Sequence, residues 1–359
     1  MSVAEEHSAA LLEQIGVAER LLEQRQLREA VRAFDVAEQM GADQDGCSAG
    51  RWMGAMLLGD LEAAWCESDA IRQRGGIDPH RFWMGENVRG KRVIVRCLHG
   101  FGDAIQFLRY LPRLQALAGH VIVEVPPRML SLAPLLDGVD EVITWGLEAS
   151  TQAPVWDVQI EVMELPYLFR TAQSDLPGSR EYLKVPARDV DAAAKEMGPA
   201  RRPRVGLVWA AGEWNVERSI PLGSLEPLVL ADRAEFWSLQ GGGAAEDAAQ
   251  WVSAGLIRDA AVCGDGLKVL AAVIANLDLV ITIDTLAAHM AGAMGKPTWI
   301  LLQHAADWRW MAERCDTPWY PNTRLFRQSI KGDWNGVVER IRTELVRQSF
   351  PCSADGVTT

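Results

Sequence analysis

The sequence predicts an α/β protein with two doubly wound parallel-sheet domains in tandem, preceded by a small all-α region. Apolar residues recur at helical spacing in the first 75 or so positions, and from Lys91 short β-branched runs alternate with helical segments. The alternation then restarts after Val185–Pro203. The length of 359 residues exceeds what one compact core usually holds, which also favours several domains.

The composition is that of an ordinary soluble globular protein, with 48% hydrophobic and 23% charged residues. A formal net charge of −12 argues against a nucleic-acid partner, because affinity for nucleic acids depends on neutralising phosphates. Any phosphate in a ligand must therefore be held by local groups and not by a general positive field.

The sequence contains no recognisable targeting or membrane segment. The start, Met-Ser-Val-Ala-Glu-Glu-His, lacks the basic and apolar regions of a signal peptide, and no stretch approaches the ~20 apolar residues of a membrane helix. Six cysteines are scattered without a ligand-like spacing, which favours reduced thiols over disulfides or zinc. We therefore expect a cytoplasmic protein with no transmembrane segment and no metal site.

Residues 1–85 are expected to form the helical region. Apolar residues recur every three to four positions from Ala9 to Ala37, with short polar breaks between the helices. The segment Met56–Trp65 resembles the helix–turn–helix of a tetratricopeptide unit, and the region has room for about two units of ~34 residues. Such a region would serve as a scaffold or as a docking face for a protein partner.

Residues 90–190 are expected to form the first α/β domain, with a parallel sheet covered on both faces. The expected strands are Lys91–Leu98, His120–Val125, Glu141–Trp145 and Val155–Val162, and the expected helices are Asp103–Ala118 and Arg128–Leu136. A stretch that contains prolines and charges, Val185–Pro203, is expected to be a linker.

Residues 203–330 are expected to form the second α/β domain, followed by a closing helix and tail over 331–359. The expected strands are Arg204–Ala210, Glu235–Gln240, Leu256–Asp259, Leu277–Ile283 and Thr298–Gln303. The expected helices are 222–231, 245–253, 265–276, Leu286–Met294 and the amphipathic Asp333–Arg347. In such sheets, ligands bind beyond the carboxyl ends of the strands.

Asp284 and Thr285 lie where the apolar strand Leu277–Ile283 ends and a helix of small residues begins. Free backbone N–H groups and the positive end of the helix dipole meet there, which suits a phosphate. Leu286 and Ala287 open the helix, and His289 shares the face of Thr285 one turn on. The alternative is that Asp284 or Thr285 only caps the helix.

The first strand of the first domain ends in a glycine-containing loop, His99-Gly100-Phe101-Gly102-Asp103. Gly100 and Gly102 let the backbone approach a ligand closely. The third glycine of a dinucleotide fingerprint is absent, because position 105 is Ile. Asp103 is either a helix cap or a carboxylate that takes a proton from an acceptor hydroxyl; His99 is a second candidate base, and Gln106 a candidate hydrogen-bond partner for the acceptor.

The first strand of the second domain contains Trp209 and is followed by a polar loop in which Arg218 is the single cation, next to Ser219. Arg218 is a candidate diphosphate clamp; the alternative is a surface ion pair with Glu213 or Glu217. The expected strand Glu235–Gln240 ends before Gly241-Gly242-Gly243, which would line a nucleotide or only connect two elements.

Residues 307–328 are rich in tryptophan and arginine, in a chain with 14 tryptophans. Aromatic rings beside arginine can stack on a base or a sugar. Packing beneath a long loop is the more common role of such a cluster, and we favour packing.

Together these segments resemble the family 9 glycosyltransferases, the ADP-heptose:lipopolysaccharide heptosyltransferase-like group, and in particular the bacterial branch with a tetratricopeptide region before the transferase. The resemblance extends over roughly residues 55–348. It is carried by Gly100–Pro112, Arg218–Leu222, Asp284-Thr285 with His289, Gly295-Lys296-Pro297, Asp307–Trp310 and Pro318–Pro321.

The resemblance implies a GT-B fold of two Rossmann-like domains, with the acceptor on the first and a nucleotide-sugar donor on the second. It implies an inverting, metal-independent transfer with Asp103 as the base and no cofactor besides the nucleotide-sugar substrate. The acceptor would be a glycan, a lipopolysaccharide-type molecule or a protein, held near the His99–Gln106 loop. The donor-binding residues would be Trp209, Arg218, Ser219, Gln240, Asp284, Thr285, Leu286, Ala287 and His289.

Two departures from the heptosyltransferase pattern are visible. Glu213-Trp214-Asn215 occupies the loop in which heptosyltransferases carry a lysine, and Leu286 stands where they usually have glycine. A second hypothesis therefore stays open: a non-catalytic nucleotide-sugar-binding or scaffold protein that docks partners through its helical region.

Overall fold

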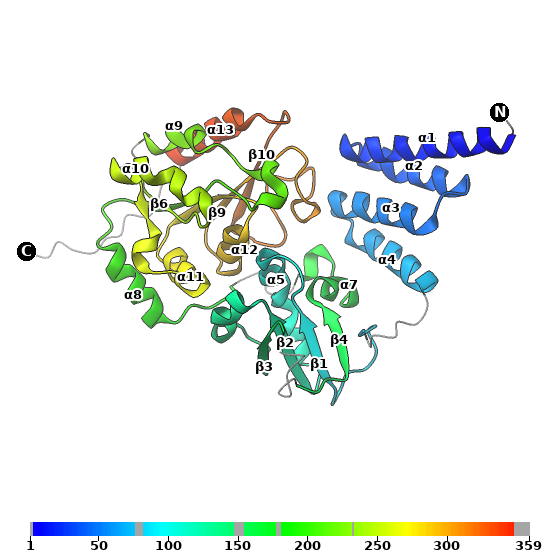
Figure 1. The fold of residues 1–359 in the computed structure, drawn as a ribbon, viewed down its shortest axis with the longest axis horizontal. Helices are drawn as coiled ribbons and strands as arrows, with labels where there is room; N and C mark the ends of the chain where they lie inside the picture. The colour runs from blue at the N-terminus through cyan, green and yellow to red at the C-terminus, as the bar shows by residue number, and fades with distance from the viewer. Residues whose placement is uncertain (1–2, 76–81, 147–153, 177–180, 232, 348–359) are drawn as a thin grey trace, which may run out of the picture.

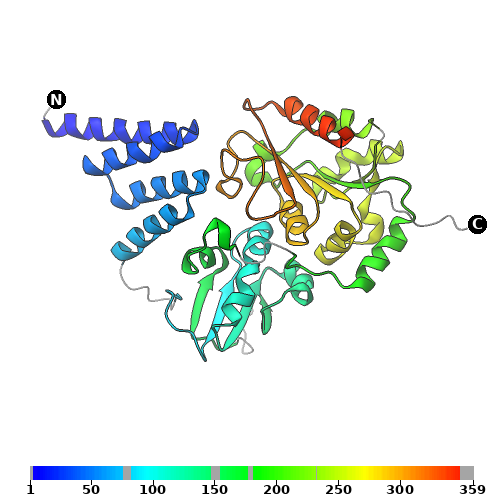
Figure 2. The same ribbon diagram turned by 180° about the vertical axis from the view of Figure 1, so that it is seen from behind.

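The computed structural model describes residues 3–75, 82–146, 154–176, 181–231 and 233–347. Four helices form a layer at the N-terminal end, and two parallel sheets with their helices form the rest of the molecule (Figure 1; Figure 2, from behind). The prediction of an α/β protein with parallel sheets is confirmed.

The N-terminal layer consists of α1 (Val3–Glu23), α2 (Leu27–Gln39), α3 (Gln44–Leu58) and α4 (Leu61–Gly75), each packed on the next. Asp43 caps α3 by accepting a hydrogen bond from the Gly46 N–H, and Gly59 ends it with a φ of 79°, a conformation that favours glycine. Buried alanines such as Ala18 and Ala37 let the helices approach closely. The structure shows the expected helices between Val3 and Gly75, and both the domain boundary at residue 85 and a tetratricopeptide identity stay predictions.

The first sheet has the order β3-β2-β1-β4, and all its pairings are parallel. Its strands are β1 (Arg92–Arg96), β2 (His120–Val125), β3 (Glu141–Thr144) and β4 (Val158–Glu161). Its connections contain α5 (Phe101–Phe107), η1 (Leu108–Tyr110), α6 (Leu111–Gln115), η2 (Pro127–Leu135), η4 (Val162–Glu164), α7 (Leu165–Leu168) and η5 (Gln173–Asp175), where η marks a 3₁₀ helix.

Two helix predictions in this domain are corrected. The single helix expected over Asp103–Ala118 is instead α5, η1 and α6 in succession, and Pro112, which cannot donate a backbone hydrogen bond, lies in the first turn of α6. The helix expected over Arg128–Leu136 is the 3₁₀ helix η2, which contains Pro134.

The second sheet has the order β10-β9-β8-β5-β6-β7, again parallel throughout. Its strands are β5 (Arg204–Val208), β6 (Glu235–Ser238), β7 (Arg258–Asp259), β8 (Leu279–Ile283), β9 (Thr298–Leu302) and β10 (Thr323–Arg327). Its helices are η6 (Glu213–Arg218), η7 (Leu222–Leu225), α9 (Glu226–Val229), η8 (Gly243–Ala248), α10 (Ala249–Ser253), η9 (Ala260–Cys263), α11 (Leu267–Ala275), α12 (Leu286–Ala293), η10 (Trp308–Trp310) and α13 (Trp334–Arg347).

Two further differences from the sequence prediction concern α8 and β10. The stretch Val185–Pro203, expected to be a linker, contains α8 (Ala187–Met197), which packs on α11 through its buried Ala193 and Met197. Strand β10 was not predicted, because its residues lie within the aromatic and charged segment that follows β9.

The hydrophobic core positions the site. One continuous cluster joins the first sheet and α5 to α11 and α12 of the second domain, and another lies between the second sheet and α13. Helices α5 and α12 are in contact at the centre of the molecule, where both views place them together. Because each follows a strand (β1 and β8), their N-terminal turns lie at the carboxyl ends of the two sheets.

Candidate functional site

The first side of the site is the N-terminal turn of α5, which carries Asp103. The Asp103 Oδ2 accepts a hydrogen bond of 3.0 Å from the Gly100 N–H, so Asp103 stabilises the helix start from its third position. Its Oδ1 lies 2.8 Å from Nη2 of Arg309, with 26% of the Asp103 side chain exposed. The carboxylate therefore serves the helix start with one oxygen and faces the second domain with the other.

The other residues that the sequence analysis proposed for the acceptor lie in different surroundings. His99, the first residue of the loop, is exposed, whereas Gln106 is fully buried. Within the described residues, no hydrogen-bond partner is found for either polar atom of the Gln106 side chain. The structure therefore does not bring Gln106 to the surface beside Asp103.

The second side of the site is the N-terminal turn of α12, which begins after Thr285. The Thr285 hydroxyl does not cap the helix: it lies 3.0 Å from the Thr282 hydroxyl and donates to the Ile283 carbonyl at 3.4 Å. The capping alternative is therefore wrong for Thr285. With no side-chain cap at this position, the backbone N–H groups at Leu286 and Ala287 are suited to an anion.

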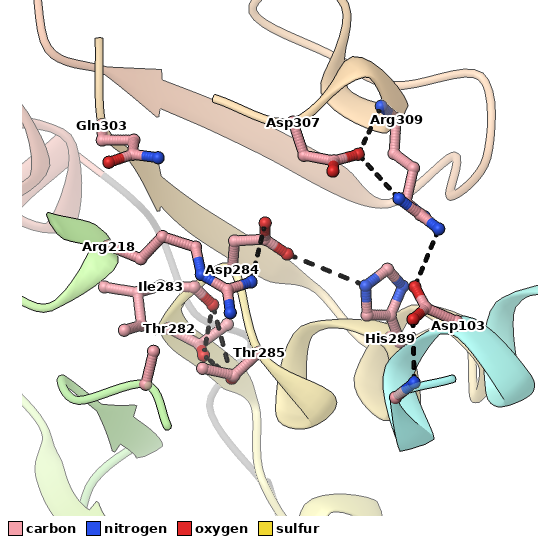
Figure 3. Close-up of polar contacts among 12 residues, drawn as sticks. Asp103, Arg218, Thr282, Ile283, Asp284, Thr285, His289, Gln303, Asp307 and Arg309 are labelled. Atoms are coloured by element: carbon pink, nitrogen blue, oxygen red, sulfur yellow. Dashed lines mark hydrogen bonds and ion pairs between the residues drawn. The ribbon is translucent and has the colours of Figure 1, made fainter. Parts of the chain in front are cut away.

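Asp284 connects the second side to two basic groups (Figure 3). Its Oδ2 lies 3.3 Å from Nη1 of Arg218, and its Oδ1 lies 3.8 Å from Nε2 of His289. Burial by itself raises the pKa of Asp284, but His289, Arg218 and the Trp310 indole outweigh it, so that the pKa lies below its ordinary value. Asp284 is thus an ionised, buried carboxylate.

Arg218 pairs with Asp284 at the start of α12. Glu217 instead lies 3.5 Å from the Lys331 ammonium group, while the side chains of Glu213 and Trp214 lie outside the described residues. Arg218 is therefore held at the start of α12, as a diphosphate clamp requires.

His289 lies between the two helices and is only 4% exposed. Its Nδ1 is 2.9 Å from the Tyr320 hydroxyl, and its ring stacks on Trp310 with 5.3 Å between the centroids. A Cβ atom built on Gly102 of α5 would lie 2.6 Å from the His289 Cδ2. His289 therefore contributes to the packing between α5 and α12.

Trp209, Ser219 and Gln240 shape the loop that follows β5. The Gln240 Oε1 accepts hydrogen bonds from the Trp209 and Ala210 N–H groups at 3.1 and 2.9 Å. The Ser219 Oγ accepts one from the Ala211 N–H at 3.0 Å. Trp209 is itself buried, so these residues would act on a donor through the shape of the loop.

Sequence reasoning missed Arg309 and Asp307, which it assigned to a packing cluster. The Arg309 Nη1 lies 2.8 Å from the Asp307 Oδ1, so that one guanidinium joins Asp307 to Asp103 (Figure 3). The signal available in the sequence was the short segment Asp307-Trp308-Arg309, but no local pattern links it to Asp103, which lies far away in the sequence.

Sequence reasoning also missed Glu161, which ends β4 beside β1. Burial raises the pKa of Glu161 to about 7, although the Met163 N–H and the nearby His99 act in the opposite direction. The carboxyl end of the first sheet therefore carries, besides Asp103, the carboxyl group of Glu161, whose pKa lies near neutrality.

Among the described residues, no group of three His, Cys, Asp or Glu side chains is arranged to hold a metal ion. The five cysteines in that part of the chain are free thiols, while Cys352 lies outside it. No helix there has the length and apolarity needed to cross a membrane.

Comparison with known proteins gave one curated relative and several structural neighbours, and no family model matches the chain. The chain is 26% identical over 306 residues to protein FlbA of Caulobacter vibrioides, an alignment that includes 73% of this chain and 48% of FlbA. The chain thus spans about half the length of this relative.

The structural neighbours are glycosyltransferases. A family 9 glycosyl transferase from Veillonella parvula has a TM-score of 0.56 at 14% identity, covering 73% of this chain and 99% of its own. The E. coli ADP-heptose lipopolysaccharide heptosyltransferase II has a TM-score of 0.51 at 14% identity, with 71% and 99% covered. The chain therefore shares the two-sheet α/β fold of these glycosyltransferases.

Proposed function

We propose that this protein is an inverting glycosyltransferase that moves a sugar from a nucleotide-sugar donor to a glycan or another hydroxyl-bearing acceptor. One observation carries the proposal: the N-terminal turn of α5, with Asp103, lies against the N-terminal turn of α12, with Asp284 and Thr285. A candidate base and a candidate anion site thus lie next to each other at the carboxyl ends of two parallel sheets.

The donor diphosphate would bind at the start of α12. The backbone N–H groups at Leu286 and Ala287, the helix dipole and the Arg218 guanidinium would together face its negative charge. These groups supply the stabilisation that other transferases take from a divalent cation, so we expect transfer without added metal.

The reaction would be a single displacement. Asp103 takes the proton of the acceptor hydroxyl, and the acceptor oxygen forms a bond to the anomeric carbon from the face opposite the diphosphate. The bond between that carbon and the diphosphate oxygen breaks, its electron pair stays with the nucleoside diphosphate, and the configuration inverts. The proton ends on Asp103 and the negative charge on the leaving group.

A thermal-shift panel of ADP-, UDP- and GDP-sugars tests the donor site, and ADP-heptose belongs in it because one structural neighbour is an ADP-heptose lipopolysaccharide heptosyltransferase. We expect one nucleotide class to raise the melting temperature, with the same shift in EDTA. Transfer is then followed as release of the nucleoside diphosphate in the presence of candidate glycan acceptors. An absence of any shift would contradict the proposal.

The second candidate is a nucleotide-sugar-binding or scaffold protein without transfer activity. One observation favours it: Arg218 and Arg309 are already paired with Asp284 and with Asp103 and Asp307. Binding of one nucleotide sugar, with no diphosphate release for any acceptor, would select this candidate.

A further inference from the structure

The 3₁₀ helix η10 contacts three parts of the molecule with three successive side chains. A 3₁₀ helix has three residues per turn, so successive side chains point in directions about 120° apart. Trp308 reaches the N-terminal helical layer, Arg309 reaches Asp103, and Trp310 reaches His289 on α12. A single turn therefore contacts the helical layer, the candidate base Asp103 and helix α12.

The contact with the helical layer is an aromatic one. Trp308 meets Trp52 of α3 edge to face with 5.6 Å between the ring centroids, and it also stacks on Phe107 of α5 with 6.3 Å between the centroids. Trp308 thus joins α3 to the helix that carries Asp103.

The backbone on both sides of η10 is also attached to the helical layer. The Arg25 guanidinium donates to the Ala306 carbonyl at 3.0 Å, and the Ala312 N–H donates to the Leu57 carbonyl at 2.8 Å. The segment 306–312 is therefore held at both ends by residues of α3 and of the turn after α1.

Arg309 is the member of η10 that acts on the site. It is 7% exposed, and its two terminal nitrogens bind Asp307 and Asp103, each at 2.8 Å (Figure 3). A planar guanidinium can hold two carboxylates at once in a fixed geometry, which a lysine ammonium group on a flexible stem cannot reproduce.

We propose that Arg309 is the positioning residue of Asp103, and that the N-terminal helical layer sets the position of Arg309 through the contact between Trp52 and Trp308. The helical layer then contributes to the geometry of the site, and any movement of α3 changes the alignment of Asp103. The catalytic half of this inference rests on the proposed function, whereas the structural coupling does not.

The first arm of the test measures transfer kinetics. We expect kcat to fall about 100-fold in Arg309→Met, and about tenfold in Arg309→Lys and in Trp52→Ala, with the KM for the donor nearly unchanged. Arg314→Met removes an arginine that follows the segment 306–312, and its partners, Asp316 and Gln173, are not residues of the site. This variant should keep the wild-type kcat. Equal kcat values in wild type, Arg309→Met and Trp52→Ala would overturn the inference.

The second arm does not depend on activity. Hydrogen exchange of the backbone amides of residues 100–107 should become faster in Trp52→Ala and in Arg309→Met. The comparison variant is Trp65→Ala, because the Trp65 ring contacts Tyr167 and its indole N–H donates to the Thr171 carbonyl, so this variant loosens the attachment of the helical layer to the first domain but keeps the Trp52–Trp308 pair. Unchanged exchange in Trp52→Ala, or equal acceleration in Trp65→Ala, would overturn the coupling.

The two proposals fail in different ways. If no nucleotide sugar raises the melting temperature of the wild-type protein and none is used for transfer, the proposed function is contradicted and the catalytic half of the inference is lost. Hydrogen exchange still decides the structural coupling. If the wild type transfers sugar and the Arg309 and Trp52 variants transfer it at the same rate, only the inference is contradicted.

Discussion

Gly102 of α5 and His289 of α12 approach each other so closely that a Cβ atom on Gly102 would lie 2.6 Å from the His289 Cδ2. His289 cannot easily move away, because the Tyr320 hydroxyl holds its Nδ1 and Trp310 stacks on its ring. The absence of a side chain at position 102 therefore allows the two helix starts to meet.

Gly102→Ala should force α5 and α12 apart. We expect a loss of about 1–3 kcal/mol in the free energy of unfolding, the usual cost of overpacking, and weaker donor binding, both measured by denaturant titration with and without nucleotide sugar. Gly223→Ala is the control, since a Cβ atom there would meet nothing within 4 Å. Equal stability of the two variants would show that the helices tolerate the methyl group.

Asp103→Asn should remove transfer and leave donor binding nearly intact. The amide keeps the shape that faces Gly100 but cannot take a proton, so kcat should fall roughly 100- to 10,000-fold. Asp316→Asn, in an exposed ion pair with Arg314, is the matched control. Undiminished turnover in Asp103→Asn would exclude Asp103 as the base.

Arg218→Ala should weaken binding of a nucleoside diphosphate about 10- to 100-fold, because it removes a charge-assisted partner of the phosphates. It also leaves Asp284 with one basic neighbour fewer, which should lower the melting temperature of the unliganded protein. Calorimetric titration and thermal melting measure the two effects. Arg201→Ala, at an exposed arginine before β5, should change neither; unaltered affinity in Arg218→Ala would remove it from the donor site.

Glu161 should make the stability of the protein depend on pH. Its pKa in the folded protein is about 7, above the ordinary 4.5, so the folded state binds more protons between these values than the unfolded state. The contribution of Glu161 is therefore fully present below pH 4.5 and is lost as the pH rises through 7, by an amount on the order of 1–3 kcal/mol.

Glu161→Gln removes this titration. The free energy of unfolding of the variant, measured in denaturant from pH 5 to pH 8, should fall less with pH than that of the wild type. Glu62→Gln, at an exposed position of α4, should run parallel to the wild type. Parallel curves for Glu161→Gln as well would assign the pH dependence to other groups.

Local sequence patterns predicted the elements that depend on local interactions. The apolar run before Asp284 is β8, with all five residues buried, and the small residues after Thr285 form α12. Strand β10 was not predicted, because Arg324 and Arg327 interrupt the run of apolar residues in this strand at the edge of the sheet. Helix α8 was not predicted, because its polar residues and the preceding Pro186 are typical of a linker. Only its packing on α11 shows which face of the helix is buried.

The sequence by itself determined the α/β class with parallel sheets, the helical start of the chain and the placement of Asp103 and Asp284 at helix starts, because periodicity and strand ends are local properties. Only the tertiary structure decided that Arg309 binds Asp103, that Arg218 binds Asp284 and that Gly102 meets His289. These contacts join residues far apart in sequence, and their distances depend on how the two sheets and the helical layer pack, which no local pattern encodes.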